Sequence, residues 1–250
     1  MSKPPKALFG SNPDFVKRPP FETAQLRDSL TRFLDAPFDD PSGAKVLVGN
    51  YRWGVYAFFD YDREPIYVGQ TKESLRTRIR RHLTNQRTDA VAMSVLDPFE
   101  VFEIAVWPLP QFEAVSPKDK VASKPARLHL DALERLITTQ AVANSRFQAI
   151  LNEKDPPSGL LEVDEPPSFR GRIVSEEVLE LRAHPDSRIA RRSLTMSRLA
   201  QVISERQVTG GLRRTLLTQA RRLEWLSKRR YEGMGGAAAV ARKSEEDSED

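Results

Sequence analysis

One stretch, WGVYAFFDYDREPIYVGQTKESLRTRIRRHL from Trp53 to Leu83, constrains the fold more than any other part of the chain. Two short apolar runs flank a polar segment, Tyr61 to Pro65, and this pattern predicts a β-hairpin. Pro65 has no N–H for a central ladder, so the second strand is expected to start after it. The hairpin would place Tyr56 and Tyr67 side by side near one end of the sheet.

A strongly basic helix is predicted directly after the hairpin, beginning near Ser74. Its apolar seam recurs every four residues and consists of Leu75, Ile79 and Leu83. Because each helical residue advances about 100° around the axis, Arg78 and His82 fall beside this seam, one turn apart. We therefore expect both side chains to lie over the hairpin, so that two phenols, a guanidinium and an imidazole converge.

These motifs resemble those of the GIY-YIG nuclease superfamily. Gly54-Val55-Tyr56 corresponds to the first half of the name motif and Tyr67-Val68-Gly69 to the second. Arg78 matches the family's helix arginine, and His82 matches a histidine found in some members, including homing and restriction endonucleases. The resemblance implies a mixed α/β (α+β) fold: a small three-stranded antiparallel sheet flanked by helices, here with a helical, arginine-rich C-terminal extension.

The same resemblance assigns two residues further along the chain. A third strand is predicted over 99–107 and a helix over 126–143; the family carries a metal-binding glutamate on this helix, which Glu134 resembles. The family also has a later asparagine that braces the site. Asn152 follows the expected apolar residues but lies far from Glu134, whereas Asn144 lies at a more ordinary distance without them. We favour Asn152, and Asn144 stays open.

The implied chemistry is metal-assisted hydrolysis of a phosphodiester bond. Glu134 would hold one divalent cation, Mg²⁺ or Mn²⁺, which acts as a Lewis acid and keeps several waters. The planar donors of Arg78 match phosphate geometry and would stabilise the charge that develops in the transition state. A phenol has a pKa of about 10, which a nearby cation and arginine lower, so one tyrosine could take a proton from water while the other positions the phosphate. The resemblance implies that Tyr56 is the general base and leaves Tyr67 to position the phosphate, and His82 would relay protons or contact the phosphate.

Each of these residues also has an ordinary structural explanation. A helix glutamate commonly pairs with a nearby lysine or arginine, a strand tyrosine often packs half-buried, and a histidine can cap a basic helix. No single residue establishes the functional interpretation. The order and spacing of the complete set favour it.

Composition divides the chain into five regions. They are a flexible arm over 1–20, a GIY-YIG nuclease domain with an N-terminal helix over 21–153, a Pro-rich acidic linker over 154–169, a basic helical region over 170–232, and a disordered acidic tail over 233–250.

Arginine is concentrated on the basic helix and in the C-terminal region, where helices are predicted over 175–182, 187–206 and 212–230. Phosphate contacts are predicted for Arg76, Arg80, Arg81, Arg191, Arg192, Arg213 and Arg214. Arg76 and Arg80 are expected to point toward solvent. The alternative for the C-terminal arginines is an ordinary solvated face, and the C-terminal helices can either bind DNA or associate through their leucine stripe.

Composition excludes several classes of protein. The 250 residues contain no cysteine, which excludes a disulfide framework, a thiolate metal site and a cysteine nucleophile, and is consistent with a cytoplasmic protein. Neither a membrane-spanning apolar run nor a signal peptide is recognisable, so no membrane partner is expected. The net charge of +4, despite an acidic tail, favours a polyanionic partner such as DNA.

The sequence therefore predicts a divalent-metal-dependent DNA endonuclease, most like the restriction-endonuclease branch and acting as a homodimer. The alternatives are a repair or mobile-element nuclease that recognises DNA structure, and a non-catalytic nucleic-acid-binding module. The hydrolytic hypothesis requires the two phenols, Arg78 and Glu134 to meet around a cation-sized gap. It would fail with the Glu134 helix on the opposite side of the sheet.

Overall fold

The computed structural model describes residues 19–39, 43, 45–84, 95–156, 158–159 and 161–236. The predicted arm and the predicted acidic tail lie almost entirely outside the described residues.

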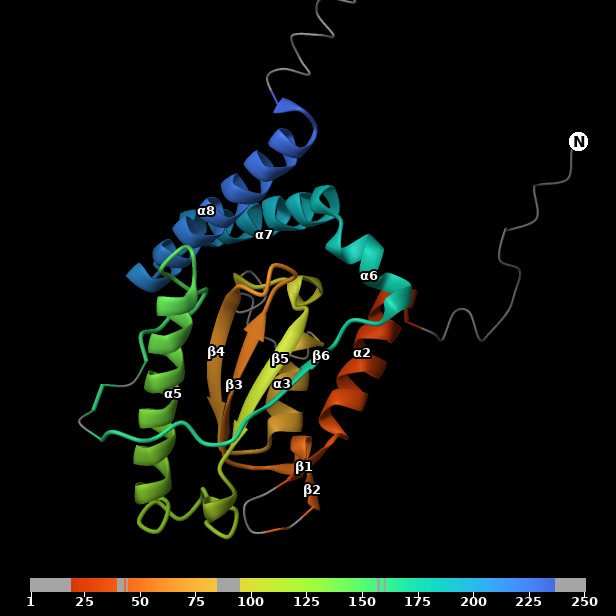
Figure 1. Cartoon of the computed structure of the whole chain (residues 1–250). Helices are drawn as coiled ribbons and strands as arrows, with labels where there is room; N and C mark the ends of the chain where they lie inside the picture. The colour runs from red at the N-terminus through yellow and green to blue at the C-terminus, as the bar shows by residue number, and fades with distance from the viewer. Residues whose placement is uncertain are drawn as a thin grey trace, which may run out of the picture.

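The centre of the fold is an antiparallel sheet of four strands in the order β4-β3-β5-β6 (Figure 1). The strands are β3 (Gly54–Phe59), β4 (Pro65–Thr71), β5 (Glu103–Pro108) and β6 (Phe169–Arg172). The predicted hairpin is confirmed, and Pro65 is the first residue of β4 rather than the residue before it. β4 forms one edge of the sheet and β6 the other.

The prediction of a three-stranded sheet was wrong, because β6 adds a fourth strand beside β5. The sequence Phe-Arg-Gly-Arg is a poor strand pattern, since glycine and arginine pack little apolar surface. It pairs because β5 would otherwise present a row of unbonded N–H and C=O groups along its outer edge. That requirement is set by the sheet and not by the local sequence.

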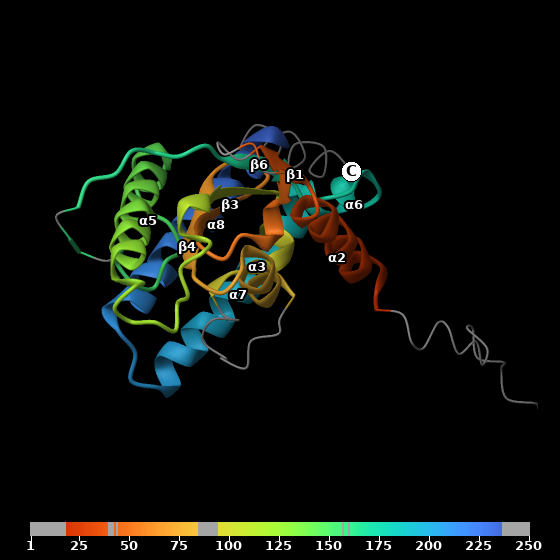
Figure 2. The same ribbon diagram turned by 90° about the horizontal axis from the view of Figure 1, so that it is seen from below.

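Helices cover both faces of the sheet (Figure 2). The helices α2 (Phe21–Leu34) and α3 (Leu75–Leu83) pack on one face, against alternate strand residues that include Tyr56 and Phe58. On the other face α5 (Lys124–Asn144) packs against the intervening residues, which include Val55 and Ala57. Because successive strand side chains point to opposite faces, each face has its own apolar core.

Short elements complete this part of the fold. They are a two-stranded ribbon of β1 (Pro37–Asp39) and β2 (Lys45–Leu47), and the 3₁₀ turns η1 (Val48–Asn50), η2 (Pro98–Glu100) and η3 (Pro110–Phe112).

Within the described part of the chain, three helices follow the sheet: α6 (Glu176–Ala183), α7 (Pro185–Glu205) and α8 (Gly210–Gly233). Helix α8 begins at Gly210, two residues before the predicted start at 212. The helices α7 and α8 pack on each other and lie across the end of the sheet where β3 turns into β4 (Figure 1). No helix among the described residues has the length and apolar character to cross a bilayer.

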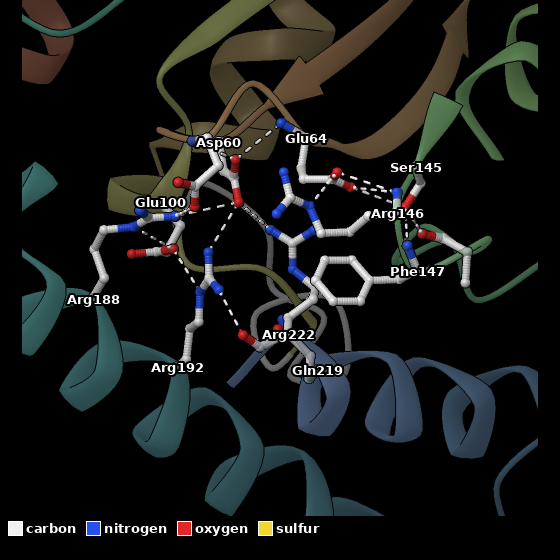
Figure 3. Close-up of polar contacts among 12 residues, drawn as sticks. Asp60, Glu64, Glu100, Ser145, Arg146, Phe147, Arg188, Arg192, Gln219 and Arg222 are labelled. Carbon is white, nitrogen blue, oxygen red and sulfur yellow. Dashed lines mark hydrogen bonds and ion pairs between the residues drawn. The ribbon is translucent and has the colours of Figure 1, made fainter. Parts of the chain in front are cut away.

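A buried ionic cluster joins these helices to the hairpin turn (Figure 3). Asp60 Oδ2 accepts from Arg192 Nη2 at 2.9 Å, Arg222 Nη2 at 2.5 Å and Arg188 Nη2 at 3.4 Å. Arg192 Nε also donates to Glu100 Oε2 at 2.9 Å. Asp60, Glu100 and the three arginines are each at most 5% exposed. The three guanidinium groups are therefore shielded from water, and pairing with the two carboxylates compensates for their lost hydration.

The two carboxyl groups of this cluster respond differently to their surroundings. Burial alone would raise the pKa of Asp60, but the guanidinium groups of Arg222, Arg192 and Arg188 outweigh burial and lower it. Burial raises the pKa of Glu100 even though Arg192 and Arg188 oppose it. Asp60 is therefore the firmly ionised centre of the cluster.

The prediction that Arg192 contacts phosphate was wrong, because the side chain is buried and bound by Asp60 and Glu100. On α7 it lies four residues after Arg188 and seven before Leu199, all on the buried face. The spacing of these residues therefore indicated an inward-facing arginine.

The segment predicted as a linker is bound to the domain. Glu165 accepts from Trp107 Nε1 at 2.8 Å and from Gln140 Nε2 at 3.0 Å, and Val163 packs against the core beneath α5. The domain boundaries themselves stay predictions.

We predict that Asp60→Asn lowers the free energy of unfolding by about 3–5 kcal/mol, since it leaves buried guanidinium groups without their central charge. Urea unfolding measures the change, and Asp28→Asn, at an exposed aspartate of α2, is the matched control.

The contribution of Asp60 to folding stability should depend on pH in a definite direction. Because the pKa of Asp60 is lowered in the folded state, its contribution is present at neutral pH and is lost as the pH falls below about 4. The Asp60→Asn variant should lose less stability than the wild type over that acidic range. An equal loss in both proteins would contradict the assignment.

Candidate active site

The register of the hairpin places Gly69 opposite Tyr56 and Tyr67 opposite Phe58. A Cβ atom on Gly69 would lie 2.6 Å from the hydroxyl oxygen of Tyr56 and 3.0 Å from Cε1 of Tyr67, so glycine is required for the phenols to occupy these positions. The two tyrosine rings stack with centroids 6.2 Å apart. The prediction that they lie side by side is confirmed.

Helix α3 brings two further groups to the phenols. Ser74 caps the helix by accepting from Thr77 N, which fixes where its turns begin. The Tyr56 hydroxyl hydrogen-bonds His82 Nδ1 at 3.3 Å, and the His82 ring meets the Tyr67 ring edge-on with centroids 4.5 Å apart. The predicted position of His82 over the hairpin is confirmed.

Arg78 lies one turn before His82 and hydrogen-bonds Tyr56. Burial lowers the pKa of Arg78, but the interactions with Tyr56 and Tyr67 outweigh burial and raise it. Its buried Nε has no hydrogen-bond partner among the described residues. A donor of this guanidinium therefore remains available to an oxygen atom of a ligand.

The position of Glu134 meets the condition under which the hydrolytic hypothesis was expected to fail. Its helix, α5, packs on the face of the sheet opposite α3 (Figure 2), the arrangement that was expected to exclude a shared site. That condition overlooked the position of β4 at the edge of the sheet, where groups from both faces can approach one another.

Gln70 lies on the α5 face of this edge strand, because it is two residues beyond Val68, which packs on that face. It follows Gly69 on β4 and its Nε2 donates to Glu134 Oε2 at 2.8 Å. Burial raises the pKa of Glu134, and the positive charge of Arg78 is one of the influences that oppose this rise, so the two charges interact electrostatically. The groups from the two faces are thus coupled.

The surroundings of Glu134 suit a hard cation. Burial raises the pKa of Glu134, the Asp131 charge raises it further, and the Gln70 hydrogen bond and Arg78 offset this only partly. The available donors are carboxylate and amide oxygens, which Mg²⁺ prefers. No group of three or more His, Cys, Asp or Glu residues suited to one ion occurs within the described ranges, so a cation bound here would keep several waters.

Asn152 braces the edge strand. Its Nδ2 donates to Val68 O at 2.7 Å and its Oδ1 accepts from Val68 N at 3.0 Å, which satisfies both backbone groups of an edge residue. The neighbouring Leu151 N donates to Ile66 O at 2.8 Å. Asn144 is exposed at the end of α5, so the bracing geometry favours Asn152.

The arginines of α3 that were predicted to contact phosphate are engaged within the protein. Arg76 Nη2 pairs with Asp35 Oδ1 at 2.6 Å, and Arg80 Nη2 donates to Thr31 Oγ1 at 2.9 Å. Their predicted direction toward solvent was wrong, because both side chains tie α3 to residues of α2 and its C-terminus. Arg81 forms an ion pair with Glu73.

The remaining predicted phosphate contacts lie on α7 and α8. Arg191 is largely shielded and pairs with Glu22 at 3.0 Å. Arg213 and Arg214 are exposed, and Arg214 pairs with the exposed Asp155 at 2.8 Å. An exposed ion pair is worth little, so Arg214 can exchange its partner for a phosphate.

Sequence reasoning missed Gln70 and Asp131. Nε2 of Gln70 also donates to Asp131 Oδ1 at 2.8 Å. The available signal was helical spacing, because Asp131 precedes Glu134 by three residues and therefore shares its face.

The comparison with protein families agrees with the first half of this site. A family model described as GIY-YIG catalytic domain matches residues 52–114, which include Tyr56, Tyr67, Arg78 and His82. The match ends before α5, so Glu134 and Asn152 lie outside it. Neither the curated proteins nor the solved structures include a match to this chain.

We predict that Asn152→Ala lowers the free energy of unfolding by about 1–3 kcal/mol, because it leaves the N–H and C=O of Val68 unbonded. Chemical denaturation measures the change. The matched control is Asn144→Ala, for which we expect a change within about 0.5 kcal/mol. Equal losses in the two variants would contradict the role of Asn152 as the brace.

Proposed function

We propose that this protein is a divalent-metal-dependent DNA endonuclease that hydrolyses phosphodiester bonds. The matched GIY-YIG domain suggests a nuclease. The observation that carries the proposal is the hydrogen-bonded group of Tyr56, His82 and Arg78 beside the same edge strand that holds Glu134 through Gln70.

Tyr56 is the proposed general base. Its side chain is fully buried, and its hydroxyl contacts both a guanidinium and an imidazole. The neighbouring positive charge of Arg78 stabilises the phenolate, which can then accept a proton from the attacking water. His82 is only partly buried, so it can pass that proton between the buried phenol and solvent.

Arg78 is the proposed stabiliser of the transition state. Its side chain is partly buried and its Nε is unbonded, so the guanidinium can donate to a phosphate oxygen, and such a charge-assisted bond is stronger where water is excluded. Tyr67 stacks beside Tyr56 and is placed to orient the phosphate. Asn152 holds the strand that carries Tyr67.

Glu134 is the proposed ligand of Mg²⁺ or Mn²⁺, which when bound supplies a Lewis acid to the phosphate oxygens. The carboxylate is partly buried, hydrogen-bonds Gln70 of the edge strand and has the carboxylate of Asp131 nearby. These features fit a cation held by few protein ligands.

The proposed biological role is that of a type II restriction-like enzyme located in the cytoplasm and acting as a homodimer. The resemblance carries this part of the proposal. An apolar groove between α7 and α8, lined by Met196, Ala200, Leu216, Leu217 and Leu223, is the surface we propose for the second copy, because Leu217 remains 52% exposed there. The alternatives are a repair or mobile-element nuclease and a non-catalytic binding module.

We predict Mg²⁺-dependent cleavage of supercoiled plasmid DNA. Glu134→Gln and Arg78→Ala should each reduce the cleavage rate by about 10²–10³-fold, because each removes charge stabilisation from the transition state. Tyr56→Phe should reduce it at least as far as His82→Ala, since the histidine acts through the phenol.

The matched control is Tyr231→Phe, which alters an exposed tyrosine of α8 and should leave the rate unchanged. Binding without cleavage under Mg²⁺ and Mn²⁺ would instead support the non-catalytic module. Unchanged cleavage by Glu134→Gln would refute the assigned metal ligand.

We also predict that Arg214→Ala weakens DNA binding similarly for all sequences. It should reduce the slope of log affinity against log salt by about one, because it removes one phosphate contact. Fluorescence anisotropy at several salt concentrations measures this slope. Lys118→Ala, at an exposed basic residue distant in sequence, is the control, and an equal effect there would argue against a binding surface on α8.

A further inference from the structure

The amide of Gln70 lies between two carboxylates. Its Nε2 is 2.8 Å from Asp131 Oδ1 and 2.8 Å from Glu134 Oε2. An amide nitrogen carries two hydrogens, so each carboxylate receives one of them. Both carboxylates are therefore aimed at the same point in space, and a neutral group occupies that point.

This arrangement leaves negative charge poorly compensated. Asp131 and Glu134 are one helical turn apart on α5, and the charge of Asp131 acts directly on Glu134. The amide of Gln70 contributes a dipole and no net charge. A divalent cation at the same point would be stabilised by two carboxylates at once.

Arg78 is electrostatically coupled to this pair. Its Nε has no hydrogen-bond partner among the described residues, and its guanidinium charge acts on Glu134. An anionic group bridging the cation and Arg78 would satisfy this donor. A DNA phosphate has the charge and the oxygen atoms to do so.

We propose that Asp131 is the second carboxylate of the cation site and that Gln70 holds Asp131 and Glu134 in place until the cation displaces its amide. This inference rests on the proposed metal-dependent function and assigns two residues to it. Asp131 binds the cation directly or through one of its waters. Gln70 acts through the two carboxylates, which makes it a positioning residue.

The two roles predict effects of opposite sign on cation binding. Asp131→Asn removes a charge and should weaken Mn²⁺ binding by about 10–100-fold. Gln70→Leu removes a competitor for the same point, so it should leave Mn²⁺ affinity equal or tighter. Without Mn²⁺, Gln70→Leu should melt at a lower temperature than wild type, because the two carboxylates repel each other with no shared donor, and added Mn²⁺ should restore most of the loss.

The experiment is isothermal titration of the full chain with Mn²⁺, with and without duplex DNA, together with thermal melting. Asp28→Asn, at an exposed helical aspartate, is the control for the loss of a carboxylate. Gln201→Leu is the control for the amide, because Gln201 Nε2 donates to Glu205 Oε1 at the same distance of 2.8 Å away from the site. Asp131→Glu, which keeps a carboxylate, should retain more affinity than Asp131→Asn if folding is intact.

Three results would overturn the inference. The first is a wild type that binds no Mn²⁺ at millimolar concentration, and the second is wild-type affinity in Asp131→Asn. The third is equal weakening by Gln70→Leu and Asp131→Asn, which would make Gln70 a required ligand. Cleavage assays run in parallel distinguish failure of the proposed nuclease activity from failure of this inference. If Mn²⁺ binding follows the expected pattern but no DNA is cleaved, only the nuclease activity is refuted. If DNA is cleaved but Asp131→Asn binds Mn²⁺ as tightly as wild type, only this inference is refuted.

Discussion

The antiparallel register that sets Tyr56 opposite Gly69 is the constraint on which the candidate site depends. With a hydrogen atom in place of a side chain at Gly69, the Tyr56 phenol can lie across β4 and reach His82 and Arg78 on α3. A shift of one residue would turn Tyr56 to the other face of the sheet, toward α5. The apolar residues that alternate with the phenols prevent that shift, because they fill the core beneath α5.

The edge position of β4 explains how helices on opposite faces contribute to one site. An edge strand exposes backbone groups that need partners, and Asn152 supplies them to Val68. Along this strand, Gln70 faces α5 and reaches Glu134, while its neighbour Gly69 faces the phenols. If β4 were a central strand, the backbone of strands on both sides would separate the phenols and the α3 residues from Gln70 and Glu134.

The C-terminal helices owe their position to charge rather than to apolar packing alone. Asp60 gathers three guanidinium groups at the hairpin turn, and these pairs are shielded from solvent. A buried ion pair adds little net stability compared with apolar residues of similar shape, yet it strongly penalises arrangements that leave one partner alone. The cluster therefore specifies where α7 and α8 dock. It also explains why arginines such as Arg192 and Arg222 do not contribute to a DNA-binding surface.

The sequence by itself determined the hairpin, the Phe21–Leu34 helix and the position of Arg78 and His82 over the phenols, because local periodicity and two glycine-containing motifs specify these features over short distances. The tertiary structure alone decided the fourth strand, the burial of Arg192 and the partnership of Gln70 with Asp131. Each of these depends on residues far apart along the chain. Pairing to a free strand edge, desolvation of a charge and a shared hydrogen-bond donor are energies of assembly, and local spacing shows only which residues share a face, not which partners they meet.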